Sequence, residues 1–381
     1  MLLLALVAGA RARPSQPSTA QLQQAARAAV AAGQPGPAVQ ALTAALQHDP
    51  NWPEGLWDLG SILYEGGQIS SARQAFGRLT VLVPSRGAGW AMLGLCDFAA
   101  HDYGMSLRHL QHGRSLGLTP ASLADTARLH EAQDFLVLGQ YTQASHLLDP
   151  FALRPDVAPA VVATFGLAAL HLPVLPALMP RVLSSARAQL VLAAGRALAA
   201  AAGRHNTAAE AALRSLIRAH PRALYLRYNL GELLAAQGHN AAAVTAFQQE
   251  LRLNPRSAAT YLQLVAAELQ TADYAAAERN ASQAVRLRPN SFAAHYLLGL
   301  TLFRENRLEA AARELEISKR LQPGVSDVRY TLAQVDLRLH RTQAALREEK
   351  AFRRLAPLSS SFRLKGNLPA SVYEHPKSGT P

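Results

Sequence analysis

Histidines and carboxylates are the residues of this chain that could bind a metal or transfer protons. Three of its 13 histidines, His101, His109 and His112, lie close together in the sequence, which is the first requirement of a zinc site. No cysteine or carboxylate stands at zinc-ligand spacing beside them. Glu314 and Glu316 are two residues apart and therefore face different sides of a helix. We expect surface or packing roles for these residues, with no metal site, no cofactor and no catalytic residue.

Sequence patterns of nucleotide-binding and hydrolytic enzymes are also missing. The chain has no G-x-x-x-x-G-K-[ST] loop, no G-x-G-x-x-G after a strand and no H-E-x-x-H. Its single cysteine, Cys96, rules out an internal disulfide and is expected to be a small buried apolar residue. The sequence therefore predicts a protein that is not an enzyme.

Prolines and alanines recur with one period in the C-terminal half of the chain. Both ladders have steps of 34 residues: Pro221, Pro255, Pro289, Pro323 and Pro357, and Ala209, Ala243, Ala277, Ala311 and Ala345. Two independent ladders with the same period indicate an internal repeat. A chain of 381 residues built in this way grows by adding repeats that contact only their neighbours, so it needs no single large core.

One repeat, residues 224–257, has the pattern of two helices. Apolar and small residues at i, i+3, i+4 and i+7 predict a first helix over Leu224–Gln237. Gly238 follows it, where a helix end needs a residue that tolerates a positive φ. A second helix is predicted over Ala241–Leu253, and Pro255 stops it because proline lacks an N–H and clashes with the preceding turn.

Small residues recur where the two helices of a repeat must come closest. Gly231 stands at position 8 of its repeat and Ala243 at position 20, and a large side chain at either would push the helices apart. We therefore expect Ala243, Ala277 and Ala311 to be buried between helices. Residues at positions 7, 8 and 11 show the same pattern in several repeats: Leu59-Gly60-Leu63, Leu93-Gly94-Asp97, Leu230-Gly231-Leu234 and Leu298-Gly299-Leu302.

This pattern resembles the tetratricopeptide repeat (TPR), a 34-residue unit with W-x2-L-G-x2-Y followed by Ala, Phe, Ala and Pro at fixed offsets. The copies depart from it where Val265 replaces the small residue at position 8, and where Asp97 and Glu268 replace the aromatic residue at position 11. Nine copies in phase cover about nine-tenths of the chain. The resemblance implies an all-α fold, a right-handed superhelical solenoid of antiparallel helix pairs.

The repeats fall into two blocks. Residues 19–158 hold about four repeats, with four extra residues at 121–124, and residues 190–357 hold five. The unit between them, 159–189, is expected to be irregular after its first helix, because Pro173, Pro176 and Pro180 forbid a normal second helix. Ser184 or Ser185 is expected to cap the helix that follows. The last repeat carries Glu349 where others carry Leu or Phe, as expected of an end repeat that no further repeat covers.

The two ends of the chain differ from the repeats. Residues 1–13 form a short apolar run followed by small residues, which fits a signal peptide and is too short to span a membrane. Residues 14–18 read as a linker, and residues 358–381 as a disordered tail rich in Ser and Pro. A signal peptide predicts a bacterial periplasmic or secreted protein; without one, the protein is cytoplasmic.

The resemblance also implies a binding surface, because positions 2, 5, 9, 12 and 13 of the first helices line the concave groove of TPR proteins. In this chain these positions carry aromatic residues and arginines, the types that supply most interface energy: Tyr225, Tyr228, Tyr296, Phe303, Arg304, Tyr330, Arg338, Trp57, Tyr64 and Phe98. The middle of the chain has apolar groove residues: Leu136, Val137, Val191 and Leu198. The expected function is a non-catalytic scaffold that binds peptide segments or partner proteins in this groove.

Charge suggests the kind of partner. The segment from Arg286 to Lys365 carries 16 basic and 8 acidic residues. We hypothesise that Tyr296, Arg304, Tyr330 and Arg338 form a repeating site for an acidic or C-terminal peptide segment, held by pairing of arginine with carboxylate. Two alternatives remain open. One is a self-associating structural component of an envelope complex, and the other is a basic surface, with a sequence pI near 10.3, that binds nucleic acid or an anionic membrane.

Overall fold

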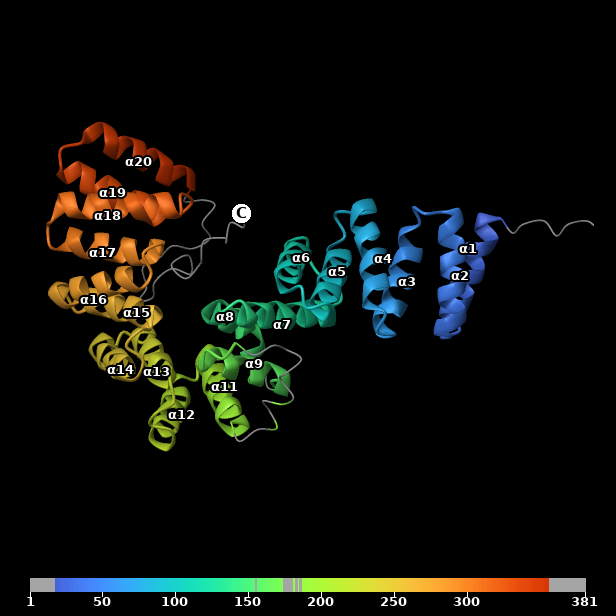
Figure 1. The fold of residues 1–381 in the computed structure, drawn as a ribbon, viewed down its shortest axis with the longest axis horizontal. Coiled ribbons are helices and arrows are strands. Elements are labelled where there is room, and N and C mark those ends of the chain that lie inside the picture. The colour runs from blue at the N-terminus through green and yellow to red at the C-terminus, as the bar shows by residue number, and fades with distance from the viewer. Residues whose placement is uncertain (1–17, 155, 174–180, 182–183, 185–186, 356–381) are drawn as a thin grey trace, which may run out of the picture. The chain divides into compact units, whose positions relative to one another are not determined.

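A computed structural model describes residues 18–154, 156–173, 181, 184 and 187–355. The expected signal peptide and the expected disordered tail lie outside these residues. All regular structure in the described part is helical, as predicted, and runs in chain order (Figure 1): α1 (Thr19–Ala31), α2 (Pro35–His48), α3 (Pro53–Glu65), α4 (Ile69–Leu82), α5 (Gly87–Ala99), α6 (Tyr103–Ser115), α7 (Ala121–Val137), α8 (Tyr141–Ala152), α9 (Pro159–Ala169), α11 (Ala188–Ala202), α12 (Asn206–Ala219), α13 (Leu226–Ala236), α14 (Asn240–Leu253), α15 (Ala258–Gln270), α16 (Tyr274–Leu287), α17 (Phe292–Arg304), α18 (Leu308–Leu321), α19 (Ser326–Arg338) and α20 (Thr342–Leu355).

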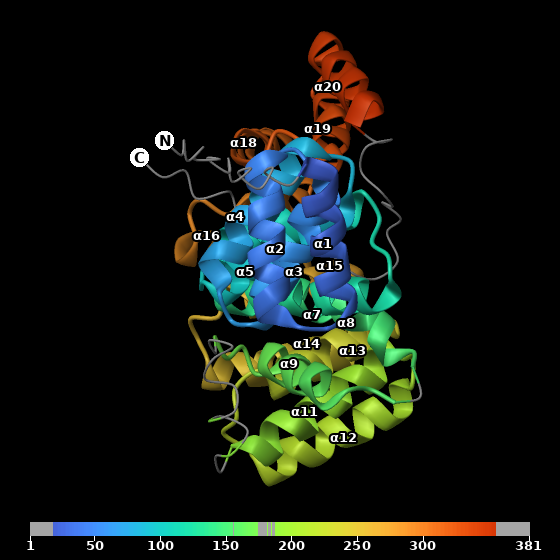
Figure 2. The same cartoon turned by 90° about the vertical axis from the view of Figure 1, so that its right-hand side faces the viewer.

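The chain divides into two compact units, residues 1–134 and 135–381, which are described separately. In the first unit, α1 to α6 form three successive helix pairs, and Figure 2 shows α1 and α2 side by side. In the second, α13 to α20 form four more pairs stacked in chain order (Figure 1). Each pair is joined by a turn of a few residues, so its helices run antiparallel.

Small residues lie between the paired helices, as the sequence predicted. Ala243, Ala277 and Ala311 are all 0% exposed. At position 8, Gly231 faces the ring of Phe247 on the partner helix so closely that an added Cβ would lie 2.5 Å from it. Gly60, Gly94 and Gly299 meet Phe76, Leu110 and Leu315 in the same way. Each of these repeats therefore packs a large residue of its second helix onto a glycine of its first.

The turn inside each pair has one backbone conformation throughout. Position 15 has a positive φ in all nine regular repeats of the described chain: Gly33, Gly67, His101, Gly139, Arg204, Gly238, Ala272, Asn306 and His340. The following N–H bonds back to the carbonyl at position 11, as in Asp273 N to Glu268 O at 3.0 Å. This is a helix end that favours glycine.

Ala272→Gly is expected to raise the free energy of unfolding by about 0.5–1 kcal/mol, because alanine is strained at its φ of 58° and glycine is not. Gly238→Ala, at the same position one repeat earlier with φ of 81°, should lower it by a similar amount. Denaturant unfolding followed by circular dichroism measures both. Equal signs for the two changes would contradict this account of the turn.

Two departures of the sequence from the regular repeat change the length of α7 and the exposure of α20. The four extra residues at 121–124 lengthen α7 at its start, so that α7 has 17 residues where α5 has 13. At the other end of the chain, only Ala345 of α20 is buried and Glu349 is partly exposed, as expected of an end helix. Leu346 is 59% exposed on the same helix.

The irregular unit contains one described helix, α9, that packs directly on α11. Gly166 of α9 lies against the backbone of Val191, and Gly195 of α11 lies against that of Val162, so neither position has room for a Cβ. Ser184 is not the expected cap: α11 begins after Arg187, which makes no side-chain cap, and the Ser184 hydroxyl donates to Arg181 O at 3.0 Å. Ser185, Pro176 and Pro180 lie outside the described residues. Tight glycine packing on α9 positions this helix.

Candidate functional site

Three aromatic side chains from separate segments of the second unit form a stack. Tyr141 at the start of α8 lies on His171, which follows α9, with ring centroids 4.4 Å apart. The other face of His171 lies on Tyr225, just before α13, at 3.7 Å and an interplanar angle of 13°. Tyr228 meets the edge of the imidazole at 5.4 Å. The stack therefore links α8, the end of α9 and the start of α13.

The backbone under the stack is held in an uncommon conformation. His171 and Tyr225 have φ values of 50° and 67°, which non-glycine residues adopt at a cost. Tyr225 N donates to Glu250 Oε1 at 2.6 Å, and the Asn229 amide donates to Tyr225 O at 2.5 Å and to Ala169 O at 2.7 Å. Because Tyr225 is fixed in this way, α13 starts at Leu226 and not at residue 224 as predicted.

A pocket of about 450 Å³ lies beside the stack, within the second unit. Its wall combines the stacked rings with the start of α8, the first residues of α15 and α17, and two arginines: Gly139, Gln140, Tyr141, Thr142, Gln143, His171, Tyr225, Arg256, Ser257, Ala258, Ala259, Leu262, Arg288, Pro289, Asn290, Ser291 and Phe292. None of these described wall residues carries a carboxylate. The volume is in the range of sites that hold a few side chains of a ligand.

The pocket is electropositive for two reasons. Arg256 and Arg288 are both exposed at its edge. The N-termini of α15 and α17, capped by Ser257 and Ser291, both lie in the wall, and helix N-termini carry partial positive charge. Burial lowers the pKa of His171 to about 3, so its ring is neutral and serves as a flat wall. Such a site favours an anionic group over a cation.

A second pocket of about 240 Å³ shares Tyr141, Thr142 and His171 with the first and has a different character. Glu232 lines it and accepts hydrogen bonds at 2.8 Å from Tyr228 Oη and from Gln263 Nε2. Burial raises the pKa of Glu232 above its ordinary value.

The sequence of this chain matches models of a known repeat family. Family models described as "Tetratricopeptide repeat" match residues 29–96, 194–259 and 262–325, which together make up more than half of the chain. The chain belongs to the tetratricopeptide repeat family. The resemblance read from the sequence is therefore confirmed.

Solved structures to which this TPR chain is similar share little of its sequence. A structure of MamA (41-end) from Desulfovibrio magneticus RS-1 is 21% identical, covers 46% of this chain and 99% of its own, and has a TM-score of 0.43. YrrB, described as a TPR protein with an unusual peptide-binding site, is 16% identical, covers 47% and 92% of the two chains, and has a TM-score of 0.40. A search of curated proteins gave no match.

The groove residues predicted for the C-terminal TPR block differ in how far they are exposed. Tyr228, Tyr296 and Phe303 are 1%, 7% and 7% exposed, and therefore pack inside the unit and offer little surface. Tyr225 is half-buried in the pocket wall. The other three are accessible: Arg304 is exposed, Tyr330 is 49% exposed, and Arg338 places its guanidinium 4.5 Å from the ring of Phe303.

The residues predicted in the first TPR block are all half-buried: Trp57, Tyr64 and Phe98. Trp57 packs edge-on against Phe76 at 5.7 Å and lies under Arg86 at 4.5 Å. Sequence reasoning missed four residues of the pocket in the second unit: Tyr141, His171, Arg256 and Arg288. The two arginines had a signal, since each lies beside a proline of the 34-residue ladder, Pro255 or Pro289, and hence at the entry to a first helix.

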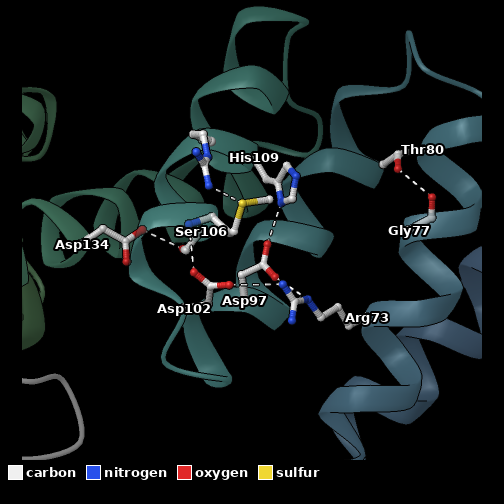
Figure 3. A network of polar contacts seen from close by, with 10 residues as sticks. Arg73, Gly77, Thr80, Asp97, Asp102, Ser106, His109 and Asp134 are labelled. Carbon is white, nitrogen blue, oxygen red and sulfur yellow. Dashed lines mark hydrogen bonds and ion pairs between the residues drawn. The ribbon is translucent and has the colours of Figure 1, made fainter. Parts of the chain in front are cut away.

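A polar network in the first unit explains one departure from the TPR pattern. Asp97 is fully buried at position 11, 2.6 Å from Arg73 Nε and 2.6 Å from His109 Nδ1 (Figure 3). The Ser106 hydroxyl donates to Asp134 at 2.7 Å, and burial raises the pKa of Asp134 to about 8. These groups contact one another inside the first unit, with Asp134 Oδ1 left without a hydrogen-bond partner, and they form a packing network and not a second site.

His295 contacts the segment just before α17, which includes Arg288 of the pocket wall. Its Nδ1 lies 2.7 Å from Glu314 Oε2 and its Nε2 lies 2.8 Å from Pro289 O. Both partners are acceptors, so a ring that donates to both is protonated. The hydrogen bond to Glu314 raises the pKa of His295 above its ordinary value, against the effect of burial.

The His295 contact is expected to weaken as pH rises. Its folded-state pKa exceeds the unfolded value of about 6.5, so its stabilisation is complete below that pH and is lost as pH rises through the folded-state pKa. His295→Gln should therefore cost about 1–2 kcal/mol in mildly acidic buffer and less in alkaline buffer. Denaturant unfolding at a series of pH values measures the difference, and a cost that grows with pH would contradict the assignment.

Proposed function

We propose that this TPR protein is an interaction scaffold whose second unit binds a peptide segment through a carboxylate, either an acidic side chain or a chain terminus. TPR proteins are typically non-catalytic interaction scaffolds, and the chain shares their architecture. The observation that supports a carboxylate is the pocket wall, which holds two arginines, two helix N-termini and no acidic side chain among its described residues. Guanidinium groups pair strongly with carboxylates because both are planar and can form two parallel hydrogen bonds.

The aromatic stack supports the other half of the proposal. Tyr141, His171 and Tyr225 are fixed against one another, so a ligand side chain that packs on them costs the protein little conformational entropy. Tyrosine at a rigid surface supplies contact area and a hydroxyl group in one residue. The accessible groove residues of the last repeats, Arg304 and Arg338, could extend the same kind of contact along the peptide.

Peptide binding gives the test. A library of peptides with free C-termini and internal acidic residues is screened against the full chain, and its best binders are measured by fluorescence polarisation. Arg256→Gln with Arg288→Gln should weaken them by about 10- to 100-fold, since each removes a charge-assisted contact. The matched control changes Arg252 and Arg286 to Gln, because these arginines are also exposed, on the preceding helices, and lie outside the pocket wall. Equal losses in the two variants would refute the pocket as the binding site.

Among the apolar groove residues predicted for the middle of the chain, Leu136 and Val191 are 1% and 0% exposed and pack inside the second unit, while Val137 and Leu198 are half-buried. They therefore offer little exposed apolar surface for the alternative of self-association. An exported location remains a proposal that rests on residues 1–13. No helix among the described residues combines the length and the apolar character needed to cross a bilayer. Determining the N-terminal residue of the mature protein tests the proposed cleavage.

A further inference from the structure

Arginine recurs at one position of all five repeats in the C-terminal block. The position is 29, in the last turn of the second helix of each repeat, and every copy is exposed: Arg218, Arg252, Arg286, Arg320 and Arg354. Successive copies are 34 residues apart and lie on α12, α14, α16, α18 and α20 of the second unit, which Figure 1 shows in stacked succession. Equivalent positions in the earlier repeats carry Gln47, Val81, Ser115 and Leu153, so the ladder belongs to this block alone.

A second column of arginines lies on the same face of the last three of these helices. Arg279, Arg313 and Arg347 are exposed at position 22, seven residues or two helical turns before the first column. Both columns point away from the buried stripe of each helix, which on α16 contains Ala277, Ala281 and Ala284. The eight arginines therefore share the outer surface of the stack, which we call the arginine face.

Most acidic side chains on these helices already contact other groups. Six of them are in ion pairs of 2.6 to 2.8 Å with residues outside the arginine face: Glu210 with Arg214, Glu278 with Arg307, Glu314 with His295, Glu316 with Lys319, Glu348 with Lys319 and Arg329, and Glu349 with Arg353. Glu250 accepts a hydrogen bond from Tyr225 N. Within the described part of the chain, none of the eight arginines of the arginine face is in an ion pair. Glu309, one turn before Arg313, is exposed and is in no ion pair with the described residues. The positive charge of this face is thus largely uncompensated.

Helix stability explains only part of this pattern. Arginine in the last turn favours a helix by about 0.3–1 kcal/mol through the macrodipole, which accounts for the column at position 29. The column at position 22 lies in the middle of its helices, where this effect is absent. An uncompensated face of like charges also costs self-repulsion. Two columns in register therefore point to an external anionic partner.

We propose that the arginine face docks the second unit on an anionic phospholipid surface. The arginines spread over the outer sides of several helices, so they present a two-dimensional array that matches a field of lipid phosphates. Single-stranded nucleic acid is disfavoured because the rings on these helices offer little surface on which bases could stack: Phe247 is buried, Tyr274 is half-buried, and Phe352 packs on Tyr330 at 5.3 Å. This contact uses other residues than the peptide pocket and goes beyond the proposed function.

Vesicle sedimentation tests the proposal with the full chain. Vesicles of phosphatidylcholine with phosphatidylglycerol should bind the protein, and vesicles of phosphatidylcholine alone should not. The variant Arg313→Gln, Arg320→Gln, Arg347→Gln should bind about 100-fold more weakly, since each basic residue near an anionic surface contributes roughly one factor of five. The matched control is Arg304→Gln, Arg307→Gln, Arg341→Gln, in which three exposed arginines at the end of α17 and in the turns before α18 and α20 lose the same total charge. It should bind within about threefold of wild type, because these three residues are not part of the arginine face.

Three results would overturn the proposal: equal losses in the two triple variants, binding to the neutral vesicles, or binding to a random duplex DNA at physiological salt in the absence of vesicle binding. Circular dichroism shows whether both variants keep their helices, as expected for exposed substitutions. Peptide affinity of the same variants separates this proposal from the pocket. The arginine-face variant should keep the wild-type peptide affinity, so failure of vesicle binding leaves the proposed function intact.

Discussion

Gly231→Leu is expected to lower the free energy of unfolding by about 3 kcal/mol. Even a Cβ at this position would lie 2.5 Å from the ring of Phe247, which is itself fully buried between α13 and its neighbours. The leucine can be accommodated only if the two helices of the repeat move apart, and each repeat stabilises the next. Guanidinium chloride unfolding of the full chain, followed by circular dichroism and by limited proteolysis across residues 190–290, measures the loss.

Gly77 supplies the control for this prediction. It lies in the middle of α4 with nothing within 4 Å of an added Cβ. Gly77→Ala should therefore stabilise the chain by roughly 0.5–1 kcal/mol, the ordinary gain from replacing glycine in a helix. If Gly231→Leu proved as harmless as Gly77→Ala, close approach of the paired helices would not be what holds the repeats together.

Asp97→Ala is expected to destabilise the first unit by about 3 kcal/mol. The carboxylate is 0% exposed and lies 2.6 Å from Arg73 Nε, in an ion pair, and 2.6 Å from His109 Nδ1 (Figure 3). Hydrogen bonds to charged groups contribute about 1.5–3 kcal/mol each, and Arg73 recovers part of this in water because its side chain is 41% exposed. Hydrogen exchange of α5 and α6, together with denaturant unfolding, measures the change where it arises.

Asp102 gives a comparison within the same network. It also contacts Arg73, at 3.4 Å, and caps α6 by accepting from Met105 N, but its side chain is 43% exposed. Asp102→Ala should cost about 1 kcal/mol, the usual loss of a helix cap. Equal losses for the two aspartates would mean that burial of Asp97 has no special energetic weight.

The sequence was a good guide to contacts that repeat every 34 residues. The packing at positions 8 and 20 can be predicted from one repeat, because that repeat contains both the small residue and the large residue that packs on it. That is why Gly231 and Ala243 could be assigned from the repeat pattern alone, and why their burial agrees with the prediction. The charged final helix containing Glu349 follows from the same logic.

The pocket could not be predicted in the same way, because its parts come from segments far apart in the chain. His171 belongs to the irregular unit, which no repeat pattern describes, and it lies between Tyr141 and Tyr225 only after α9 packs on α11. The conformation of Tyr225 depends on Glu250 and Asn229, which are contacts of the folded state. Tyr296 and Phe303 were assigned to the surface from repeat position alone, and the structure buries both inside the second unit.

The central claim is that the pocket between α8, α13, α15 and α17 holds a carboxylate, and a double-mutant cycle tests it most directly. Four affinities are measured: wild-type and Arg256→Gln protein, each with the best peptide from the screen and with the same peptide whose critical carboxylate is an amide. The account predicts about a tenfold loss on amidation for the wild-type protein and little further loss for the variant, because the two groups contact each other. If amidation of the peptide weakens binding by the same factor for the wild-type and the Arg256→Gln protein, the arginine and the carboxylate do not contact each other, and the proposed site is contradicted.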